Sequence, residues 1–223
     1  MDLGVRYFGK NVEPLDADQA MNNYIAQHTK DTLDEIWLFE LKPSYIHGIE
    51  NVDISLPAIN DIPVVKSDRG GLMTYHGPGQ LIVCVLLDLG RMQLHPVAFM
   101  QTLEKSLSAV LNTYGINTQT KEGAPGVFVG DAKIASVGMR IQRGLTTHGL
   151  SLNIDMDLEP FKAISTCGFE DLAMVQMSQF KPNAVVNDVA KELAAELALA
   201  FGFDSLLELD NELAKLAFTE EYN

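Results

Sequence analysis

The chain has few cysteines and few basic residues for its length. Only Cys84 and Cys167 occur in 223 residues, which is too few for a disulfide framework and favours a reducing, cytoplasmic setting. There are 16 Lys and Arg against 30 Asp and Glu, so the net charge is −14. Such an acidic chain is not expected to bind nucleic acid in general.

Long apolar runs are also absent. No stretch of about 18 apolar residues occurs, so no membrane-spanning helix is expected. The first residues show no basic region followed by an apolar one, and no secretory signal is expected. These absences predict a protein without a membrane partner, and we expect a monomer.

The motifs of several cofactor sites are missing too. A glycine-rich stretch at residues 69–80 lacks the Gly-Lys-Ser/Thr ending of a phosphate loop, and it is not a GxGxxG dinucleotide fingerprint. His47, His76 and His148 are spaced too widely for a metal motif, so structural or hydrogen-bonding roles are favoured. We therefore expect neither a metal nor another cofactor.

What the chain does contain is ordinary globular composition, with 47% hydrophobic and 21% charged residues. The order of apolar patterns, without repeats or linkers, predicts one mixed α/β domain over residues 1–223. The recognisable motifs fall within about residues 5–180, and an acidic helical part is expected at 183–223. A small basic island comprises Lys121, Lys133, Arg140 and Arg143.

Periodicity predicts the individual elements. Strands are expected at residues 35–41, 62–67, 81–89 (central), 116–120, 127–129, 133–141 and 147–154, with an edge strand at 4–9. Helices are expected at 16–29 with Asp16 as N-cap, at 95–114, 160–166 and 185–201, and as an acidic last helix at 204–217. Residues 42–56 are expected to form a loop.

The glycine-rich stretch is the most informative segment. Residues 69–80 hold four glycines and a proline between two apolar runs, far more glycine than a hairpin needs. Backbone of this kind bends sharply and allows close approach of a ligand. We interpret the stretch as the wall of a binding site.

Two side chains could carry chemistry. A lone cysteine such as Cys167 is more often a buried apolar residue than a nucleophile, and nucleophilic action requires a nearby cation to favour the thiolate. Lys133 could supply that cation, although a solvated lysine beside a hairpin is the commoner case. Strand alternation predicts that Lys133 shares a face with Ala135, Val137 and Met139. Cys84, inside an apolar run, is expected to be a core residue.

Several segments together resemble the octanoyltransferases of lipoate biosynthesis. The order of motifs along the chain matches that family, and the similarity covers roughly residues 5–180. These motifs are Asp-Arg-Gly-Gly-Leu-Met-Thr-Tyr-His-Gly-Pro-Gly-Gln (68–80), Ala-Pro-Gly-Val-Phe-Val (124–129), Lys-Ile-Ala-Ser-Val-Gly (133–138), His-Gly-Leu-Ser-Leu-Asn (148–153) and Cys-Gly-Phe (167–169).

The resemblance implies a fold similar to biotin and lipoate protein ligases. It also implies transfer of an octanoyl group from acyl carrier protein to a lysine on lipoyl domains of 2-oxoacid dehydrogenases and on the glycine cleavage H protein. By match to the motifs, Cys167 is the nucleophile that forms a thioester, and Lys133 is its activating partner. Implied substrate contacts are Arg69, Gly70, Gly71, Leu72, Met73, Thr74, Tyr75, His76, Ser136, Val137, Gly138, Gly149, Leu150 and Ser151.

Elementary chemistry is compatible with that mechanism. Exchange between thioesters is nearly even in energy, so it needs positioning more than driving force. Glycine-loop N–H groups could hold the oxyanion, and an octanoyl chain needs an apolar slot. Where the family often has two histidines, or an aromatic residue and His, this chain has Thr147-His148, which affects the expected shape of the acyl entrance.

Two other functions remain open from the residues alone. One is an ATP-dependent lipoate or biotin ligase of the same fold, which would need no nucleophilic cysteine. The other is a non-catalytic module that binds an acyl chain or a carrier protein. Acyl carrier proteins are acidic, so docking is expected to use Lys121, Arg140 or Arg143 rather than the acidic C-terminal part.

Overall fold

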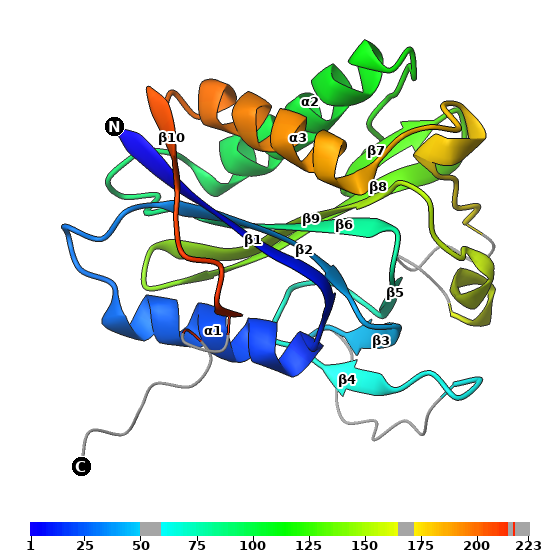
Figure 1. The fold of residues 1–223 in the computed structure, drawn as a ribbon, viewed down its shortest axis with the longest axis horizontal. Coiled ribbons are helices and arrows are strands. Elements are labelled where there is room, and N and C mark those ends of the chain that lie inside the picture. The colour runs from blue at the N-terminus through cyan, green and yellow to red at the C-terminus, as the bar shows by residue number, and fades with distance from the viewer. Residues whose placement is uncertain (50–58, 165–171, 214–215, 217–223) are drawn as a thin grey trace.

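A twisted seven-stranded sheet runs through the middle of the computed structural model, which describes residues 1–49, 59–164, 172–213 and 216 (Figure 1). The strand order is β10-β1-β2-β6-β9-β8-β7. β1 pairs in parallel with β10 and β2, and the remaining pairs are antiparallel. The strands are β1 (Asp2–Val12), β2 (Glu35–Leu41), β6 (Gln80–Leu86), β7 (Gly126–Val129), β8 (Ala132–Gln142), β9 (Leu145–Asn153) and β10 (Ser205–Glu208).

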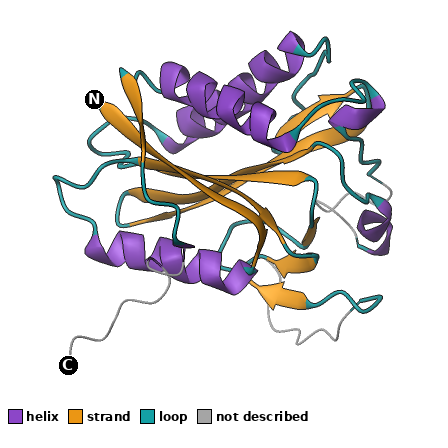
Figure 2. Cartoon of the chain, viewed as in Figure 1, coloured by secondary structure: helices purple, strands orange, loops and turns teal. Residues whose placement is uncertain are grey.

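Helices cover both faces of this sheet (Figure 2). α1 (Pro14–Gln27) lies on one face, and α2 (Pro96–Thr113) and α3 (Val186–Ala200) lie on the other. The central strand β6 is apolar on both sides because it is covered twice. Its residues Val83 and Val85 join the core under α2 and α3, while Ile82 and Cys84 join the core under α1.

A second, three-stranded sheet lies beside one end of the large sheet. Its order is β4-β3-β5, formed by β3 (Ser44–His47), β4 (Val64–Lys66) and β5 (Thr74–His76). Short 3-10 helices follow at η1 (Glu159–Ala163) and η3 (Met177–Gln179). β3 lies in the segment 42–56 that was expected to be a loop, and this prediction was wrong because a four-residue strand leaves too short a pattern to detect. The glycine-rich stretch also contains a short strand, β5.

The main elements were predicted correctly. Strand β2 matches its expected bounds, β6 is central, β7, β8 and β9 are successive strands, and α2 and α3 are the two long amphipathic helices. η1 begins one residue before the expected helix at 160–166 and overlaps it as far as Ala163, and residues 165–166 lie outside the described ones.

Four local expectations were wrong. β1 is not at the edge, because β10 pairs with its outer side where a helix at 204–217 had been expected. The N-cap of α1 is Glu13 and not Asp16, since Pro14 occupies the first turn, where its fixed φ suits the helix. Residues 116–120 make only an isolated bridge from Gln119 to Phe128 instead of a strand.

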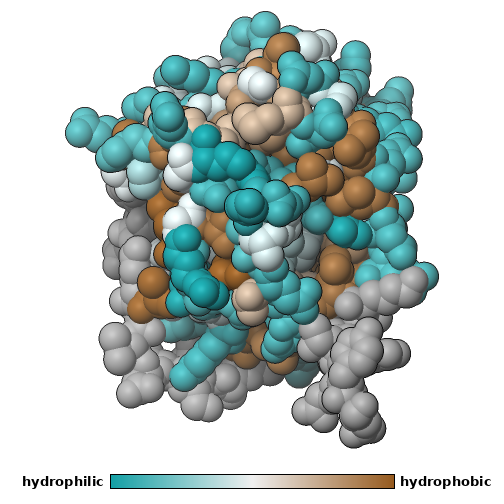
Figure 3. Space-filling view, turned by 90° about the vertical axis from the view of Figure 1, so that its left-hand side faces the viewer, coloured by the Kyte–Doolittle hydropathy of each residue, from teal (hydrophilic) through white to brown (hydrophobic). Residues whose placement is uncertain are grey.

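No helix within the described ranges is long and apolar enough to cross a membrane. On the face shown in Figure 3, the coloured residues are mixed, with hydrophobic side chains in several separate groups among hydrophilic ones. Scattered surface residues of this kind are normal for a globular chain.

Candidate active site

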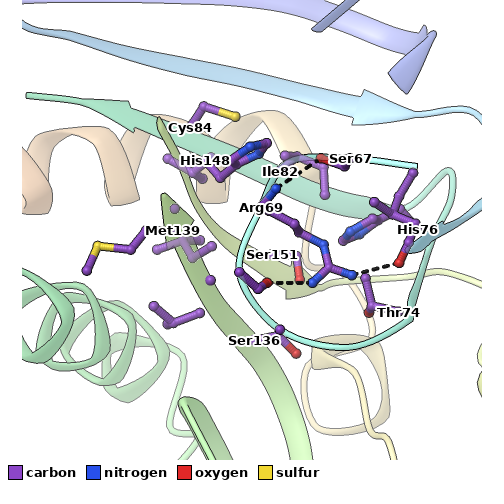
Figure 4. A pocket seen from close by; sticks show the side chains of 18 of the residues that line it. Ser67, Arg69, Thr74, His76, Ile82, Cys84, Ser136, Met139, His148 and Ser151 are labelled. Carbon is purple, nitrogen blue, oxygen red and sulfur yellow. Dashed lines mark hydrogen bonds between the residues drawn. The ribbon is translucent and has the colours of Figure 1, made fainter. Parts of the chain in front are cut away.

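A cavity of about 520 Å³ lies between α1 and the large sheet, and Met100 of α2 also lines it. Strands β6, β8 and β9 form its floor, and the loop at residues 69–73, which includes Arg69, covers it (Figure 4). α1 contributes Pro14, Ala17 and Met21. Its lining is mainly apolar, with Phe39, Ile82, Val137, Met139 and Leu150 among the side chains. We refer to the cavity below as the slot and to residues 69–73 as the roof loop.

The segments named from the sequence come together around this slot. Every implied substrate contact lines it except Tyr75. Tyr75 instead packs between Tyr45 and Phe161, with ring centroids 5.5 and 5.4 Å away, in a separate core under the small sheet. Strand alternation explains this, because Thr74 and His76 point to the face of β5 opposite that of Tyr75.

Arg69 holds the roof loop in shape. Its guanidinium donates to the carbonyl oxygens of Ile46, Gly70 and Leu72 at 2.7, 2.9 and 2.6 Å. The loop packs so closely on the end of β3 that a Cβ at Gly48 would lie 2.1 Å from the Gly71 carbonyl oxygen. Main-chain contact of this kind explains why glycine is required there.

The roof loop is also fastened to the floor. The Gly70 N–H donates to the Met139 carbonyl at 3.3 Å, so this amide is already used and is not an oxyanion donor. Asp68 accepts from His148 Nε2 at 2.8 Å and from Arg140. The hydrogen bond from His148 and the positive charges of His148 and Arg140 hold the pKa of the Asp68 carboxyl below its ordinary value.

Lys133 is fully buried beside the slot. Its Nζ donates to the Pro125 carbonyl at 2.8 Å and lies 5.3 Å from the Phe128 ring centroid. The β7–β8 register shifts between Val127 and Phe128, and Ile134 and Ala135 both enter the core under α2 and α3. Such an irregularity reverses strand alternation, so the expectation that Lys133 faces the same way as Ala135 was wrong.

Cys167 lies outside the described residues, but a segment that follows it reaches Lys133. The Lys133 N–H donates to the Ala173 carbonyl at 2.8 Å, and the Val175 N–H donates to the Lys133 carbonyl at 3.0 Å. Ala173 is six positions after Cys167 in the sequence. The chain that carries Cys167 therefore returns directly beside Lys133.

A buried chain of polar side chains fixes this returning segment. His76 Nδ1 and Gln80 Oε1 are 2.6 Å apart, Gln80 Nε2 donates to Asn153 Oδ1 at 2.8 Å, and Asn153 Nδ2 donates to the Val175 carbonyl at 3.0 Å. Because Gln80 Oε1 can only accept, His76 carries a proton on Nδ1. Burial, opposed by the Gln80 hydrogen bond, lowers the pKa of His76 to about 4.

Comparison with known proteins decides the family of this site. Residues 15–198 match the model of the lipoyl protein ligase A/B catalytic domain. The chain belongs to that family. An octanoyltransferase of Hahella chejuensis is 44% identical over 207 residues, which is 92% of each chain. Octanoyltransferases are acyltransferases, so the prediction of an enzyme and the resemblance to this class are confirmed.

Solved structures show the same fold at low sequence identity. A lipoate-protein ligase A bound with ATP is 14% identical, with a TM-score of 0.77 over 97% of this chain and 93% of that one. A biotin protein ligase from Aquifex aeolicus in complex with biotin and ATP is 9% identical, with a TM-score of 0.56 over 89% and 70%. The predicted biotin and lipoate ligase-like α/β fold is confirmed.

The sequence did not reveal which helix residues line the slot. Asp18 and Met21 line it from α1, and Met100 lines it from α2. Burial raises the pKa of the Asp18 carboxyl. These residues follow an ordinary amphipathic pattern, which marks them as inward-facing but does not show that they face a cavity. Cys84 is a core residue as predicted, and it lines the slot as well.

In the described part of the chain, no group of three or more His, Cys, Asp or Glu is arranged to hold a metal ion. The polar groups at the slot are instead paired with protein atoms, as Arg69, Asp68 and His76 show. The described part of the site is an apolar slot with a buried lysine at its side.

Proposed function

We propose that the chain transfers an octanoyl group from octanoyl-acyl carrier protein to a specific lysine of lipoyl domains. The acceptors are the lipoyl domains of 2-oxoacid dehydrogenases and the glycine cleavage H protein. The observation that carries the proposal is the slot, which is apolar, lies beside buried Lys133 and is lined by nearly all implied substrate contacts. The octanoyltransferase relatives support the same reaction.

The slot accounts for binding of the acyl chain. Each methylene removed from water contributes about 0.8 kcal/mol, so an eight-carbon chain is bound largely without polar contacts. Ser136 and Gly138 on β8 place small groups at the floor. The Lys133 amine lies next to them, because the Pro125 carbonyl accepts from both Lys133 Nζ at 2.8 Å and the Val137 N–H at 3.5 Å. A chain lying there leaves its thioester on the Lys133 side.

In the first proposed step, the Cys167 thiol gives its proton to Lys133 and its sulfur attacks the thioester carbonyl of the donor. The C–S bond to the carrier breaks, and the departing thiolate takes the proton. The product is an octanoyl thioester on Cys167. Because one thioester replaces another, the step depends on orientation more than on driving force.

In the second step, the amine of the acceptor lysine attacks the Cys167 thioester. The C–N bond of an amide forms as the C–S bond breaks, and Lys133 passes the excess proton from the amine to the Cys167 sulfur. Lys133 can serve both steps because it is held in place. Residues 173–175 bond to its backbone, and the Pro125 carbonyl accepts from its Nζ. Conversion of a thioester into an amide makes transfer downhill.

Intact-mass measurement tests this proposal directly. Incubation with octanoyl-acyl carrier protein should add one octanoyl group that hydroxylamine removes, and peptide mapping should place it on Cys167. Cys84 provides a matched control, because it is the other cysteine of the chain. Cys84→Ser should keep the adduct and Cys167→Ser should lose it.

The two alternative functions give different results in the same assay. Transfer by Cys167→Ser, or transfer that requires ATP and free octanoate, would identify an adenylate-forming ligase. Donor binding without an adduct or transfer would identify a binding module. Either result would overturn the proposed thioester route.

A further inference from the structure

One row of residues crosses four strands at the floor of the slot. The register pairs Gly138 of β8 with Gly149 of β9, Gly149 with Cys84 of β6, and Cys84 with Trp37 of β2. Cys84 and Trp37 project to the face covered by α1, and a Cβ added at Gly138 would point towards the Gly70 carbonyl of the roof loop. Gly149 lines the slot with its backbone. The row therefore starts with two positions that have no side chain and ends with a small thiol and a large indole.

The length of this row matches an acyl chain. Neighbouring strands lie about 4.8 Å apart, so β8 and β6 are separated by roughly 10 Å. A fully extended eight-carbon chain is about 9 Å long, since each of its seven C–C bonds of roughly 1.5 Å advances the zigzag by about 1.25 Å. A chain that starts at β8, near Lys133, and crosses Gly138 and Gly149 ends beside Cys84.

The far end of the row is firmly built. Trp37 is fully buried, and its indole N–H donates to Glu35 at 2.6 Å. The Phe8 and Tyr24 rings meet it edge-on, with centroids 5.5 and 6.0 Å away. A ring held on these sides cannot retreat, so the space above Cys84 is limited by the size of the side chain at position 84.

The other walls are less fixed. Met21 of α1 lies over β9, where its sulfur accepts the His148 N–H at 3.4 Å. The flexible side chain of methionine fits irregular spaces, so Met21 can adjust its position to the bound acyl chain. In Figure 4, Cys84 and Ser136 lie at opposite ends of the labelled side chains, as this direction of the slot requires.

We propose that Cys84 closes the slot and sets the longest acyl chain that the enzyme accepts. The inference rests on the proposed acyl transfer, because it assigns the direction in which the acyl chain lies. It gives Cys84 a role in specificity through size and not through thiol chemistry. A larger residue should shorten the accepted chain, and a smaller one should lengthen it.

The test compares hexanoyl, octanoyl, decanoyl and dodecanoyl carrier proteins as donors. For Cys84→Leu, kcat/KM for the longest chain that the wild type uses well should fall tenfold or more, because pockets discriminate single methylenes by about 10-fold or more. Its kcat/KM for hexanoyl donor should stay within about twofold. Cys84→Ser keeps the side-chain size and should reproduce the wild-type profile.

Cys84→Ala guards against a variant that overpacks and fails to fold. It removes volume, and it should raise kcat/KM for the next longer chain relative to octanoyl. Equal profiles for wild type, Cys84→Leu and Cys84→Ala would overturn the inference. Uniform loss for all chains in Cys84→Leu, with an unchanged profile in Cys84→Ala, would also overturn it.

Direct binding separates this inference from the proposed function. Calorimetric titration with hexanoate, octanoate, decanoate and dodecanoate measures slot length without any transfer. If the wild type transfers no acyl group, the proposed function fails, yet the binding series should still shift to shorter chains in Cys84→Leu. Absence of that shift would remove Cys84 as the end of the slot.

Discussion

At the scale of single residues, His76 links stability to pH. Its pKa is about 4 in the folded protein and about 6.5 in an unfolded chain. As pH falls below 6.5, the unfolded state takes up the proton first, so the free energy of unfolding decreases until about pH 4. Each unit of pKa difference corresponds to about 1.36 kcal/mol, which predicts a loss of roughly 3 kcal/mol across this window.

Urea unfolding at pH 7.5, 6.5, 5.5 and 4.5 measures that loss. His76→Gln retains a hydrogen-bonding side chain without a group that titrates there. The difference between wild type and His76→Gln should therefore grow in favour of the variant as pH falls. Parallel pH profiles would show that His76 is not the source of the loss.

Two glycines of the slot floor give opposite predictions for the same substitution. At Gly138 an added Cβ would meet only the Gly70 carbonyl oxygen, at 3.8 Å, so Gly138→Ala should fold normally. At Gly149 it would lie 2.5 Å from the Val83 carbonyl oxygen, so Gly149→Ala should be destabilised. Thermal unfolding should separate the pair by several degrees.

The methyl group added by Gly138→Ala would also lie on the path assigned to the acyl chain. Gly138→Ala should therefore lower kcat/KM for octanoyl donor about tenfold while leaving the melting temperature within about 2 °C. Gly138 is a cleaner position for this test than Gly70 or Gly71 in the roof loop. Gly70 is tight against Met139, and Gly71 has a φ of +89° that other residues rarely adopt. Full activity of Gly138→Ala would move the acyl chain elsewhere in the slot.

The sequence motifs identified most of the residues that line the slot, but not the direction in which some of the side chains point. Glycine content marked the roof loop, and the resemblance marked the floor positions on β8 and β9. Tyr75 was misplaced because a three-residue strand gave no signal that it alternates. Lys133 was assigned to the wrong face because a strand irregularity leaves no trace in apolar patterning.

At the scale of elements, Asp68 fastens the roof loop to β8 and β9. Asp68→Asn would remove the charge that Arg140 and His148 pair with. The loosened roof should raise KM for octanoyl donor several-fold with little change in kcat, since the Lys133 contacts are untouched. Asp131→Asn is the control, because Asp131 forms an exposed ion pair with Lys121, and such pairs contribute little.

The same ion pair predicts how the effect depends on pH. The pKa of Asp68 lies below its ordinary value when folded, so its contribution is complete above about pH 4 and is lost as pH falls through the lower value. From pH 5.5 to 8 the difference in KM between wild type and Asp68→Asn should persist. A kcat loss without a KM change would contradict a positioning role.

Long elements were predicted well because periodicity has many residues over which to appear. β2, α2 and α3 are such cases. β10 was predicted as a helix, although residues 205–208 pair with β1 at the N-terminus. β1 and β10 are more than 200 positions apart in the sequence. Their parallel pairing outweighs the helical preference of the local sequence, and no short window of sequence contains both strands.

At the scale of the whole molecule, charge opposes the proposed encounter. The chain carries −14, and an acidic carrier should be repelled except where positive side chains gather. The structure shows that not every residue of the basic island can be tested for docking in the same way. Arg140 is paired with Asp68 and Lys121 with Asp131, so reversal of either charge would also disturb local contacts.

Arg143 is therefore the sharpest probe of carrier docking. It is exposed at the turn between β8 and β9, away from the Asp68 contacts. Arg143→Glu should lower kcat/KM for octanoyl-acyl carrier protein several-fold at low salt and reduce its salt dependence, since screening acts on the steering term. Lys191→Glu is the control. It makes the same charge change at an exposed position of α3, which covers the face of the sheet opposite α1. If both variants slow the reaction equally, net charge and not this turn governs the encounter. If Arg143→Glu alone does so, the carrier approaches across the β8–β9 turn, which stands at one end of two of the strands that form the slot floor.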